Sequence, residues 1–406
     1  MRAISLFLLV ALLPVTVAAQ NTEPSSKASE DFGDLPVPSW GKAFIDSFEK
    51  PIHPIIGGIG AGGGVGFGIG YEPRTNDRWY RQVEAIFTVR RSWALQGEFG
   101  RRSASNNSQL GVFGGIRHMN RIDYFGIGSE TPYSARSAFR LREMTFGTRG
   151  SHRLNPFVKV VGIAAAYVPD LGRGRSPSVP SIENVFAESI VPGGFSTEPV
   201  FGRYRGLVEF THPGAANTDF DNVDDDSYRG TYQVALEAVR DHSEGRHNFH
   251  RWEAEVQHRI PGFRPGQRLT LHGLVASTSS NGDVPYYMLY TLGGTGGLKA
   301  FRPDMLGSDG TRATLRGFRN YRFRDRDLVL MQAEYRIPLH EQIHSTVFVE
   351  AGQVAPRTSE LFSDLKASTG FSLSYVRKGR TLGRMDVGFG GGEGVHVFWS
   401  FGAFRN

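Results

Sequence analysis

The sequence predicts an all-β protein, a transmembrane antiparallel β-barrel of about 16 strands that occupies residues 54–406. Segments of about ten residues alternate apolar and polar side chains, and the chain has 51 glycines and 12% aromatic residues. After residue 19 no window approaches the roughly 18 consecutive apolar residues of a membrane helix. A soluble β-sandwich or propeller would also alternate, but it would not usually need so many strands together with an export signal.

The N-terminus has the pattern of a secretory signal peptide over residues 1–19. Arg2 supplies the positive end, an apolar run follows, and Val17-Ala18-Ala19 form a small-residue cleavage site. A retained membrane anchor is the alternative, but the apolar run is too short to span a bilayer. Residues 20–53 are polar and without periodicity, which predicts a partly disordered periplasmic lead-in.

From residue 54 onward, alternating segments are separated by turn-rich breaks. In the last of them Val395, Val397, Trp399 and Phe401 share one face. The predicted strands are 54–71, 77–90, 92–102, 108–118, 136–149, 153–168, 199–213, 228–241, 247–260, 266–278, 284–291, 327–338, 344–355, 367–378, 382–391 and 394–404. An even number is what a closed single-chain barrel with both termini on one side requires.

The strand count predicts which connections share a rim. If the N-terminus is periplasmic, connections that follow odd-numbered strands face outward. These include the segment around Arg316 and the acid-rich Asp219–Asp226, which lacks the spacing of a calcium-binding EF-hand. The long breaks 119–135 and 169–198 fall on the periplasmic side, where a periplasmic partner protein would dock.

The chain shows no motif for catalysis, metal binding or cofactor binding. GxSxG, HExxH, the phosphate-binding P-loop and CxxC are all absent from the sequence. His242, His247 and His250 are not spaced to share one strand face. The sequence therefore predicts neither an enzyme nor a cofactor. We assign the net charge of +6 to lumen and rim residues and predict no nucleic-acid partner.

The first and last strands must pair to close a barrel, and the first predicted strand is rich in glycine. Glycine weakens a strand because it packs no side chain and loses much backbone entropy on ordering. A weak seam that opens sideways would expose strand edges to a client chain. The alternative is that the glycines let a plug or loop pack closely against the wall. The predicted seam residues are Gly62, Gly63, Gly64, Gly66, Trp399 and Phe401.

Arg316 and Glu350 form a candidate ion pair. Arg316 stands in a Gly- and Arg-rich segment without strand pattern, and Glu350 follows on an alternating strand. An arginine held away from bulk water is costly unless it is paired, and its bonds to carboxylates are directional. Phe318 and Phe348 would pack beside the pair. The alternative is a solvated loop arginine and an ordinary lumen acid.

Several short motifs follow one another along the C-terminal half of the chain. They are Thr291-Leu292-Gly293-Gly294, Leu315-Arg316-Gly317-Phe318, Arg322-Phe323-Arg324-Asp325, Glu334-Tyr335-Arg336-Ile337-Pro338-Leu339 and Phe348-Val349-Glu350-Ala351-Gly352-Gln353-Val354, with Asp123-Tyr124-Phe125-Gly126-Ile127-Gly128 further upstream. Together they resemble the BamA/TamA-like outer-membrane assembly and translocation superfamily, also called the bacterial surface antigen family. The resemblance covers roughly 120–404.

The resemblance implies a barrel whose Leu-Arg-Gly-Phe loop is tucked into the lumen, with its arginine on an acid of a Phe-x-Asp-x-Gly strand motif. Here Glu350 stands where the family usually has Asp. Residues 20–53 are too few for one of the family's periplasmic POTRA modules. Carried over residue by residue, the implied luminal latch consists of Arg316, Gly317, Phe318, Phe348, Glu350 and Gly352.

The resemblance also implies a function and a location. We expect a monomeric barrel, surrounded by outer-membrane lipid of a diderm bacterium, that inserts or translocates proteins or lipids. A client protein or a separate periplasmic partner would be its macromolecular contact. A passive porin-like or structural barrel without client transport is the alternative.

Overall fold

The computed structural model describes Ser47 and residues 50–60, 63–73, 78–212, 227–280, 282–295, 315–377 and 380–401. All of them belong to one compact unit, Lys42–Asn406. The predicted signal peptide, most of the lead-in and the acid-rich Asp219–Asp226 lie outside the described residues. In the described part no helix is long and apolar enough to cross a membrane.

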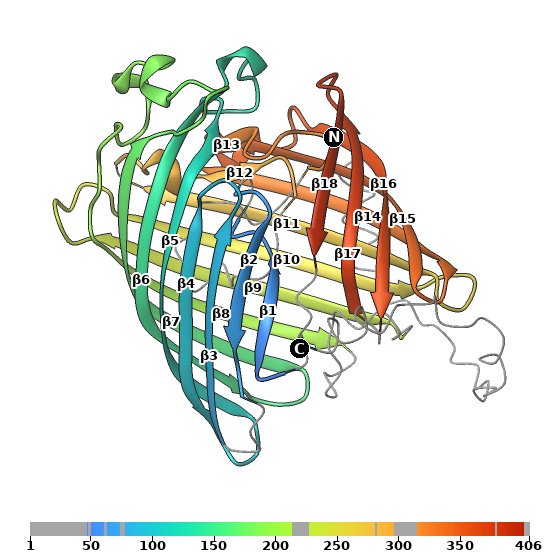
Figure 1. Ribbon diagram of the computed structural model, residues 1–406. Helices are drawn as coiled ribbons and strands as arrows, with labels where there is room; N and C mark the ends of the chain where they lie inside the picture. Colours follow the sequence, from blue (N-terminus) through green and yellow to red (C-terminus); the bar gives the residue numbers. More distant parts are fainter. Residues whose placement is uncertain are drawn as a thin grey trace. The chain divides into compact units, whose positions relative to one another are not determined.

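Sixteen strands form a single antiparallel sheet in chain order, which confirms the predicted all-β architecture (Figure 1). They are β1 (Ile52–Gly57), β2 (Gly66–Tyr71), β3 (Trp79–Thr88), β4 (Trp93–Arg102), β5 (Ser108–Tyr124), β6 (Ser137–Arg153), β7 (Val158–Arg173), β8 (Phe201–His212), β9 (Arg229–Asp241), β10 (Phe249–Pro261), β11 (Arg268–Ser280), β14 (Asp327–His340), β15 (Ile343–Ala355), β16 (Lys366–Arg377), β17 (Arg380–Gly390) and β18 (Val395–Phe401).

Short elements occupy the connections. The strands β12 (Tyr290–Leu292) and β13 (Phe323–Asp325) form a separate two-stranded sheet. The single-turn 3-10 helices are η1 (Tyr133–Ala135), η2 (Ile182–Asn184), η3 (Glu188–Ile190), η4 (Tyr286–Met288) and η5 (Thr358–Glu360).

The predicted number of wall strands is confirmed, but only because two errors cancel. One strand was missed near the N-terminus, and one predicted strand is not in the wall. The predicted strand 54–71 is a hairpin of β1 and β2, with Gly57 opposite Gly66. Its turn contains Gly64 at φ +84°, a conformation that glycine adopts without steric cost. The predicted strand 284–291 is not in the wall, because its residues form η4 and the start of β12. Both errors have one cause, since neither segment alternates polar and apolar residues.

The additional N-terminal strand changes the predicted rim of the connections that precede β11. The breaks 119–135 and 169–198, predicted to be periplasmic, share a rim with the connection from β11 to β14. Gly128 forms a β-bridge with Arg324, and Tyr287 donates a hydrogen bond of 2.9 Å to the carbonyl of Thr197. The predicted placement opposite the Arg316 segment was therefore wrong. We call this shared side the loop rim.

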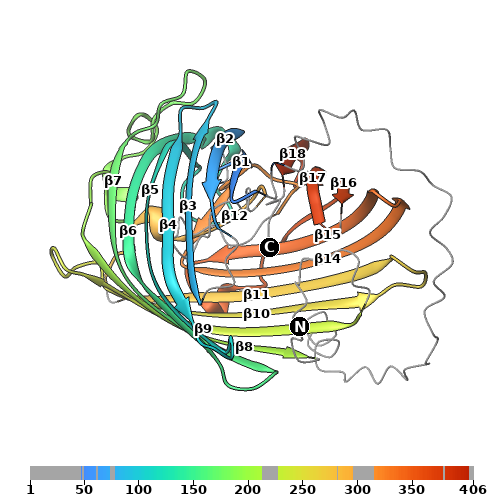
Figure 2. The ribbon, with the colours of Figure 1, turned by 60° about the horizontal axis from the view of Figure 1, so that its bottom comes forward.

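The sheet curves around its polar face (Figure 2). Ser129, between β5 and β6, donates a 2.7 Å hydrogen bond to the carbonyl of Val354 in β15. Nearby, Lys366 at the start of β16 lies 2.5 Å from Glu130. These contacts join strands far apart in the sheet order, so the concave face encloses a lumen.

Exposure along the wall is inverted relative to a soluble protein. In β6, Met144 and Phe146 are 51% and 67% exposed, whereas Glu143 and Thr145 on the opposite face are buried. The same alternation exposes Val347 and Val349 of β15. Such a face loses free energy in water and suits contact with hydrocarbon.

Candidate functional site: luminal latch and seam

The connection between β11 and β14 follows the concave face of the sheet. Its described parts are residues 282–295 and 315–326, and within them Leu292 of β12 pairs with Phe323 of β13. Leu315 and Phe318 are buried in one apolar cluster with wall residues of β11, β14 and β15. The prediction of a loop folded into the lumen is confirmed for these parts, which we call the luminal loop.

Arg316 is the centre of the luminal latch. Its backbone N–H donates to Oε2 of Glu350 at 2.7 Å, and its Nε donates to Oε1 at 2.7 Å. Its guanidinium also lies 3.0 Å from Asp386 and 2.5 Å from Glu334. The guanidinium carbon is 3.6 Å from the ring centroid of Phe348. The structure thus brings together the pair singled out from the sequence and adds two acids to it.

Arg384 balances the charge of these acids. Its Nε donates to Oδ1 of Asp386 at 2.8 Å, and its Nη2 lies 3.3 Å from Glu334. Burial alone would lower the pKa of Arg316, but the surrounding carboxylates outweigh that effect and raise the pKa above its ordinary value. The latch is therefore a charged, hydrogen-bonded network. Neither Arg384 nor Asp386 belongs to a recognised motif. The alternation of polar and apolar residues could predict their strand, but not their role in the latch.

The glycine and phenylalanine residues of the latch allow the luminal loop to lie close against the wall. A Cβ on Gly317 would lie 2.5 Å from Cβ of Ser368 and 2.6 Å from the carbonyl carbon of Phe389. Phe318 packs edge-on against Phe323 with ring centroids 5.0 Å apart. A Cβ on Gly352 would lie 2.8 Å from a backbone oxygen of the neighbouring strand. All six residues of the predicted latch lie in or directly beside this contact.

Arg322 forms a second anchor that the sequence reasoning missed. Its Nε lies 2.5 Å from Glu393, and its Nη atoms donate to the side chain and carbonyl of Thr131 at 2.9 and 2.7 Å. Its guanidinium also lies 5.0 Å from the ring centroid of Phe125. Glu393 stands in the turn between β17 and β18, so the luminal loop is tied to the hairpin that ends the sheet. In the sequence, only its position in the motif Arg322-Phe323-Arg324-Asp325 marked this arginine.

Asp325 makes the luminal loop sensitive to pH. Burial raises its pKa to about 6, and the side chain is only 3% exposed. The folded protein therefore keeps a proton that the unfolded chain releases above about pH 4. This stabilising contribution is complete below about pH 4 and is lost as the pH rises through about 6.

We expect the wild type to lose about 3 kcal/mol of unfolding free energy between pH 4 and pH 7 relative to Asp325→Asn, which has no carboxyl to ionise. Urea unfolding in lipid vesicles at both pH values measures the difference. Asp283→Asn is the matched control, because the Asp283 side chain is 71% exposed. Equal pH profiles for wild type and Asp325→Asn would contradict this prediction.

The seam is the pair of end strands β1 and β18. Among the described residues no pairing joins them, and they have six and seven residues where β5 and β6 have 17 each. Trp399 lies in β18 with 60% of its surface exposed. Phe401 ends the strand, and its side chain is outside the described residues.

The described members of the predicted seam glycines lie beside β1, not in it. Gly63 and Gly64 belong to the turn after β1, and Gly62 is outside the described residues. Gly66 opens β2, and a Cβ there would lie 2.8 Å from a methyl carbon of Ile86. The close neighbours of Gly66 are wall residues of β1 and β3, not residues of a plug or loop, so the alternative stated from the sequence is not supported at this glycine. The end strands themselves are short, with six and seven residues.

Comparison with known proteins identifies the fold. No protein-family model and no curated protein matches the chain. The BamA structure from Haemophilus ducreyi lacking POTRA domains 1–3 matches at a TM-score of 0.56 and 13% identity, over 86% of this chain and 68% of that one. CdiB from Escherichia coli matches at a TM-score of 0.54 and 11% identity, over 86% of this chain. The match spans 62% of the CdiB chain, which is less than two thirds of its length. The chain has the barrel fold of these two proteins.

Proposed function

From the premise that this chain has the BamA-type barrel fold, we propose that it is an outer-membrane β-barrel that inserts or translocates polypeptides through the seam between β1 and β18. In this proposal it is a monomer embedded in outer-membrane lipid, and its partner is a client chain in an extended or partly folded state. It performs no catalysis and uses no cofactor, since the client chain is bound by backbone hydrogen bonds.

The single observation that carries the proposal is that, in the part of the chain that the structure describes, β1 and β18 are not paired. Unpaired N–H and C=O groups are costly in hydrocarbon, where water cannot satisfy them. A strand edge in that position binds an incoming extended segment by β-augmentation, in which main-chain hydrogen bonds provide affinity without sequence preference. Six- and seven-residue end strands form fewer competing hydrogen bonds with each other than the longer strands of the wall.

A passive pore is the second candidate, and the contents of the lumen argue against it. The side chains of η4, Tyr286, Tyr287 and Met288, are buried in an apolar cluster on the concave face. Arg324 donates to the carbonyl of Tyr286 at 2.6 Å, and Arg251 donates to the carbonyl of Met288. A buried apolar plug, held by Arg251 of the wall and Arg324 of the luminal loop, is a poor lining for a water-filled channel.

Locking the seam tests the proposal. The chain has no cysteine, so introduced pairs form only the intended disulfide. Ile52→Cys or Ile56→Cys is combined with Val395→Cys or Val397→Cys, and the pairs that cross-link are reconstituted in proteoliposomes. We expect each lock to abolish assisted folding of a urea-unfolded eight-stranded outer-membrane barrel, measured by its heat-modifiable gel shift, and reductant to restore it.

The matched control is the pair Phe371→Cys and Val387→Cys, which lie opposite each other in β16 and β17. This lock leaves the seam free and is expected to have no effect. Full activity of seam-locked protein would rule out the lateral route. Wild type that folds no more client than empty liposomes, and conducts steadily in planar bilayers, would instead support the passive pore.

A further inference from the structure

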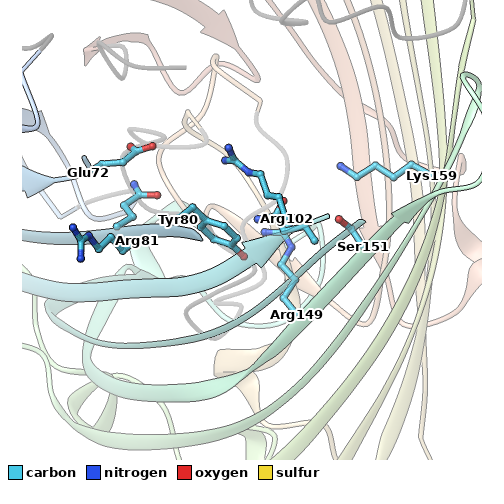
Figure 3. Close-up of a pocket in the computed structure, with 9 residues that line it drawn as sticks. Glu72, Tyr80, Arg81, Arg102, Arg149, Ser151 and Lys159 are labelled. Atoms are coloured by element: carbon cyan, nitrogen blue, oxygen red, sulfur yellow. The ribbon is translucent and has the colours of Figure 1, made fainter. Parts of the chain in front are cut away.

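A basic hollow lies on the luminal face at the rim opposite the loop rim. It has a volume of about 300 Å³, within the range of small-ligand pockets. Side chains from five consecutive strands, β3 to β7, line it. Figure 3 shows Arg102, Arg149 and Lys159 directed into one space, with Tyr80 and Ser151 beside them. The Ser151 hydroxyl group and the nearby Gln109 amide add hydrogen-bond donors.

The cations of this hollow differ from the arginines elsewhere in the lumen. Arg203 and Arg205 each lie 2.6 Å from a glutamate. By contrast, no carboxylate within the described part of the chain lies at ion-pair distance from Arg102 or Lys159. The Arg102 guanidinium instead lies 5.2 Å from the ring centroid of Tyr80. Two cations without acid partners favour an anionic ligand.

The nearby acids already have partners or a compensating neighbour. Glu98 accepts a 2.8 Å hydrogen bond from Tyr80, and Glu209, opposite Lys159 in the register, accepts one of 2.9 Å from Gln233. Glu72 is the single acid among the lining residues, against four cations. The lining therefore keeps a positive balance.

The wall is notched beside the hollow. Pairing of β2 with β3 ends at Tyr71 opposite Val83, but β3 pairs with β4 from Trp79 onward. Among the described residues Trp79–Gln82 consequently have a strand neighbour on one side only. Arg81 of this free edge points outward by alternation and still lines the hollow. Among the described residues, the hollow thus borders an edge of β3 that has no paired strand, and its lining includes a side chain of the outer face.

The outer face at this level has the composition of a membrane interface. Trp79 stacks on Phe99 with ring centroids 5.2 Å apart, and the guanidinium of Arg101 lies 5.4 Å from the Trp79 ring. Arg81 lies 5.8 Å from the ring of Tyr71. Aromatic girdles and basic residues concentrate where headgroups of anionic lipids lie.

We propose that the hollow binds the phosphate group of an anionic phospholipid, whose headgroup enters past the free edge of β3. The Arg102 and Arg149 guanidinium groups and the Lys159 ammonium group supply charge-assisted hydrogen bonds to the phosphate oxygens, and Ser151 and Gln109 bind the remaining polar atoms. This site rests on the proposed function only in placing the barrel in a membrane. It requires neither a client nor an opening seam.

Native mass spectrometry of the full chain in neutral detergent, with short-chain dihexanoyl phosphatidylglycerol as the probe, tests the site. We expect one tightly bound lipid per protein. The double variant Arg102→Gln, Lys159→Gln should bind about 30-fold more weakly because it loses two cations. The matched control Arg246→Gln, Arg357→Gln removes two exposed cations of the loop rim and should bind like the wild type.

Further probes separate the sources of the anion. We expect dihexanoyl phosphatidylcholine to bind at least tenfold more weakly, and inorganic phosphate to compete only at much higher concentration. Inorganic phosphate that binds as tightly as the lipid would assign the hollow to free phosphate and overturn the lipid site. Displacement by hexaglutamate at equal concentration would assign it to acidic polypeptide. Unchanged binding in the double variant would refute the site itself, whatever the folding assay gives.

Discussion

Replacement of Arg316 by alanine is expected to lower the free energy of unfolding by about 3–5 kcal/mol, because it leaves buried acids without their cation. Glu350 would lose the guanidinium, which now donates to it at 2.7 Å, and would keep only the backbone N–H of residue 316 from this loop position. Among the described residues, Glu334 and Asp386 would keep Arg384 as their one cation, and Asp386 would keep its hydrogen bond from Ser372. Urea unfolding in lipid vesicles measures the loss, and protease cleavage within 315–326 reports release of the luminal loop.

Two substitutions of Glu350 distinguish the loss of the ion pair from a general disruption of the fold. Glu350→Gln keeps the shape and one acceptor oxygen, so we expect a smaller loss than for Arg316→Ala. In a double-mutant cycle with Arg316→Ala and Glu350→Ala, the two losses should be strongly non-additive, because each variant removes the same contact. Arg357→Ala, on an exposed arginine, is the neutral control. Arg316→Ala within 0.5 kcal/mol of wild type, with the loop still protected, would contradict the latch.

Gly317→Ala is expected to lift the luminal loop without changing any charge. The added Cβ would lie 2.6 Å from backbone atoms of Phe389, which cannot rotate away as a side chain can. The strain of such overpacking costs about 1–3 kcal/mol, and relief by loop movement would break the Arg316 contacts. Unfolding free energy and loop proteolysis measure both effects.

Gly162→Ala is the matched control for this substitution. It lies in β7, and nothing stands within 4 Å of the position its Cβ would take. Glycine to alanine there changes propensity but not packing, so its effect should be within about 0.5 kcal/mol of zero. If Gly317→Ala and Gly162→Ala behave alike, close approach of the loop to the wall is not needed for stability.

The luminal loop holds the last hairpin at two points. Arg316 reaches Asp386 in β17, and Arg322 reaches Glu393 in the turn before β18. Movement of the loop would therefore release the strand that forms one side of the seam. In the proposed function this links the contents of the lumen to the opening of the wall.

The errors in strand prediction have one physical origin. Alternation reports which residues face lipid, and it is lost where a segment contacts protein on all sides or has too few side chains. The first case is Tyr286–Met288 inside the lumen, and the second is the glycine-rich turn between β1 and β2. One missed hairpin then reversed the predicted sides of 119–135 and 169–198, because each added strand inverts the direction of the chain.

By itself the sequence indicated an antiparallel wall with an apolar outer face, and its motifs marked Arg316 and Glu350 as candidate partners. Alternation is a local property, and the partners lie in recognisable motifs. Only the tertiary structure decided that Asp386 and Glu393 complete the anchoring of the luminal loop, 70 and 71 residues away from Arg316 and Arg322. It alone also grouped the cations of the basic hollow. These contacts depend on strand register and on the curvature of the sheet, which bring together residues that no local pattern relates.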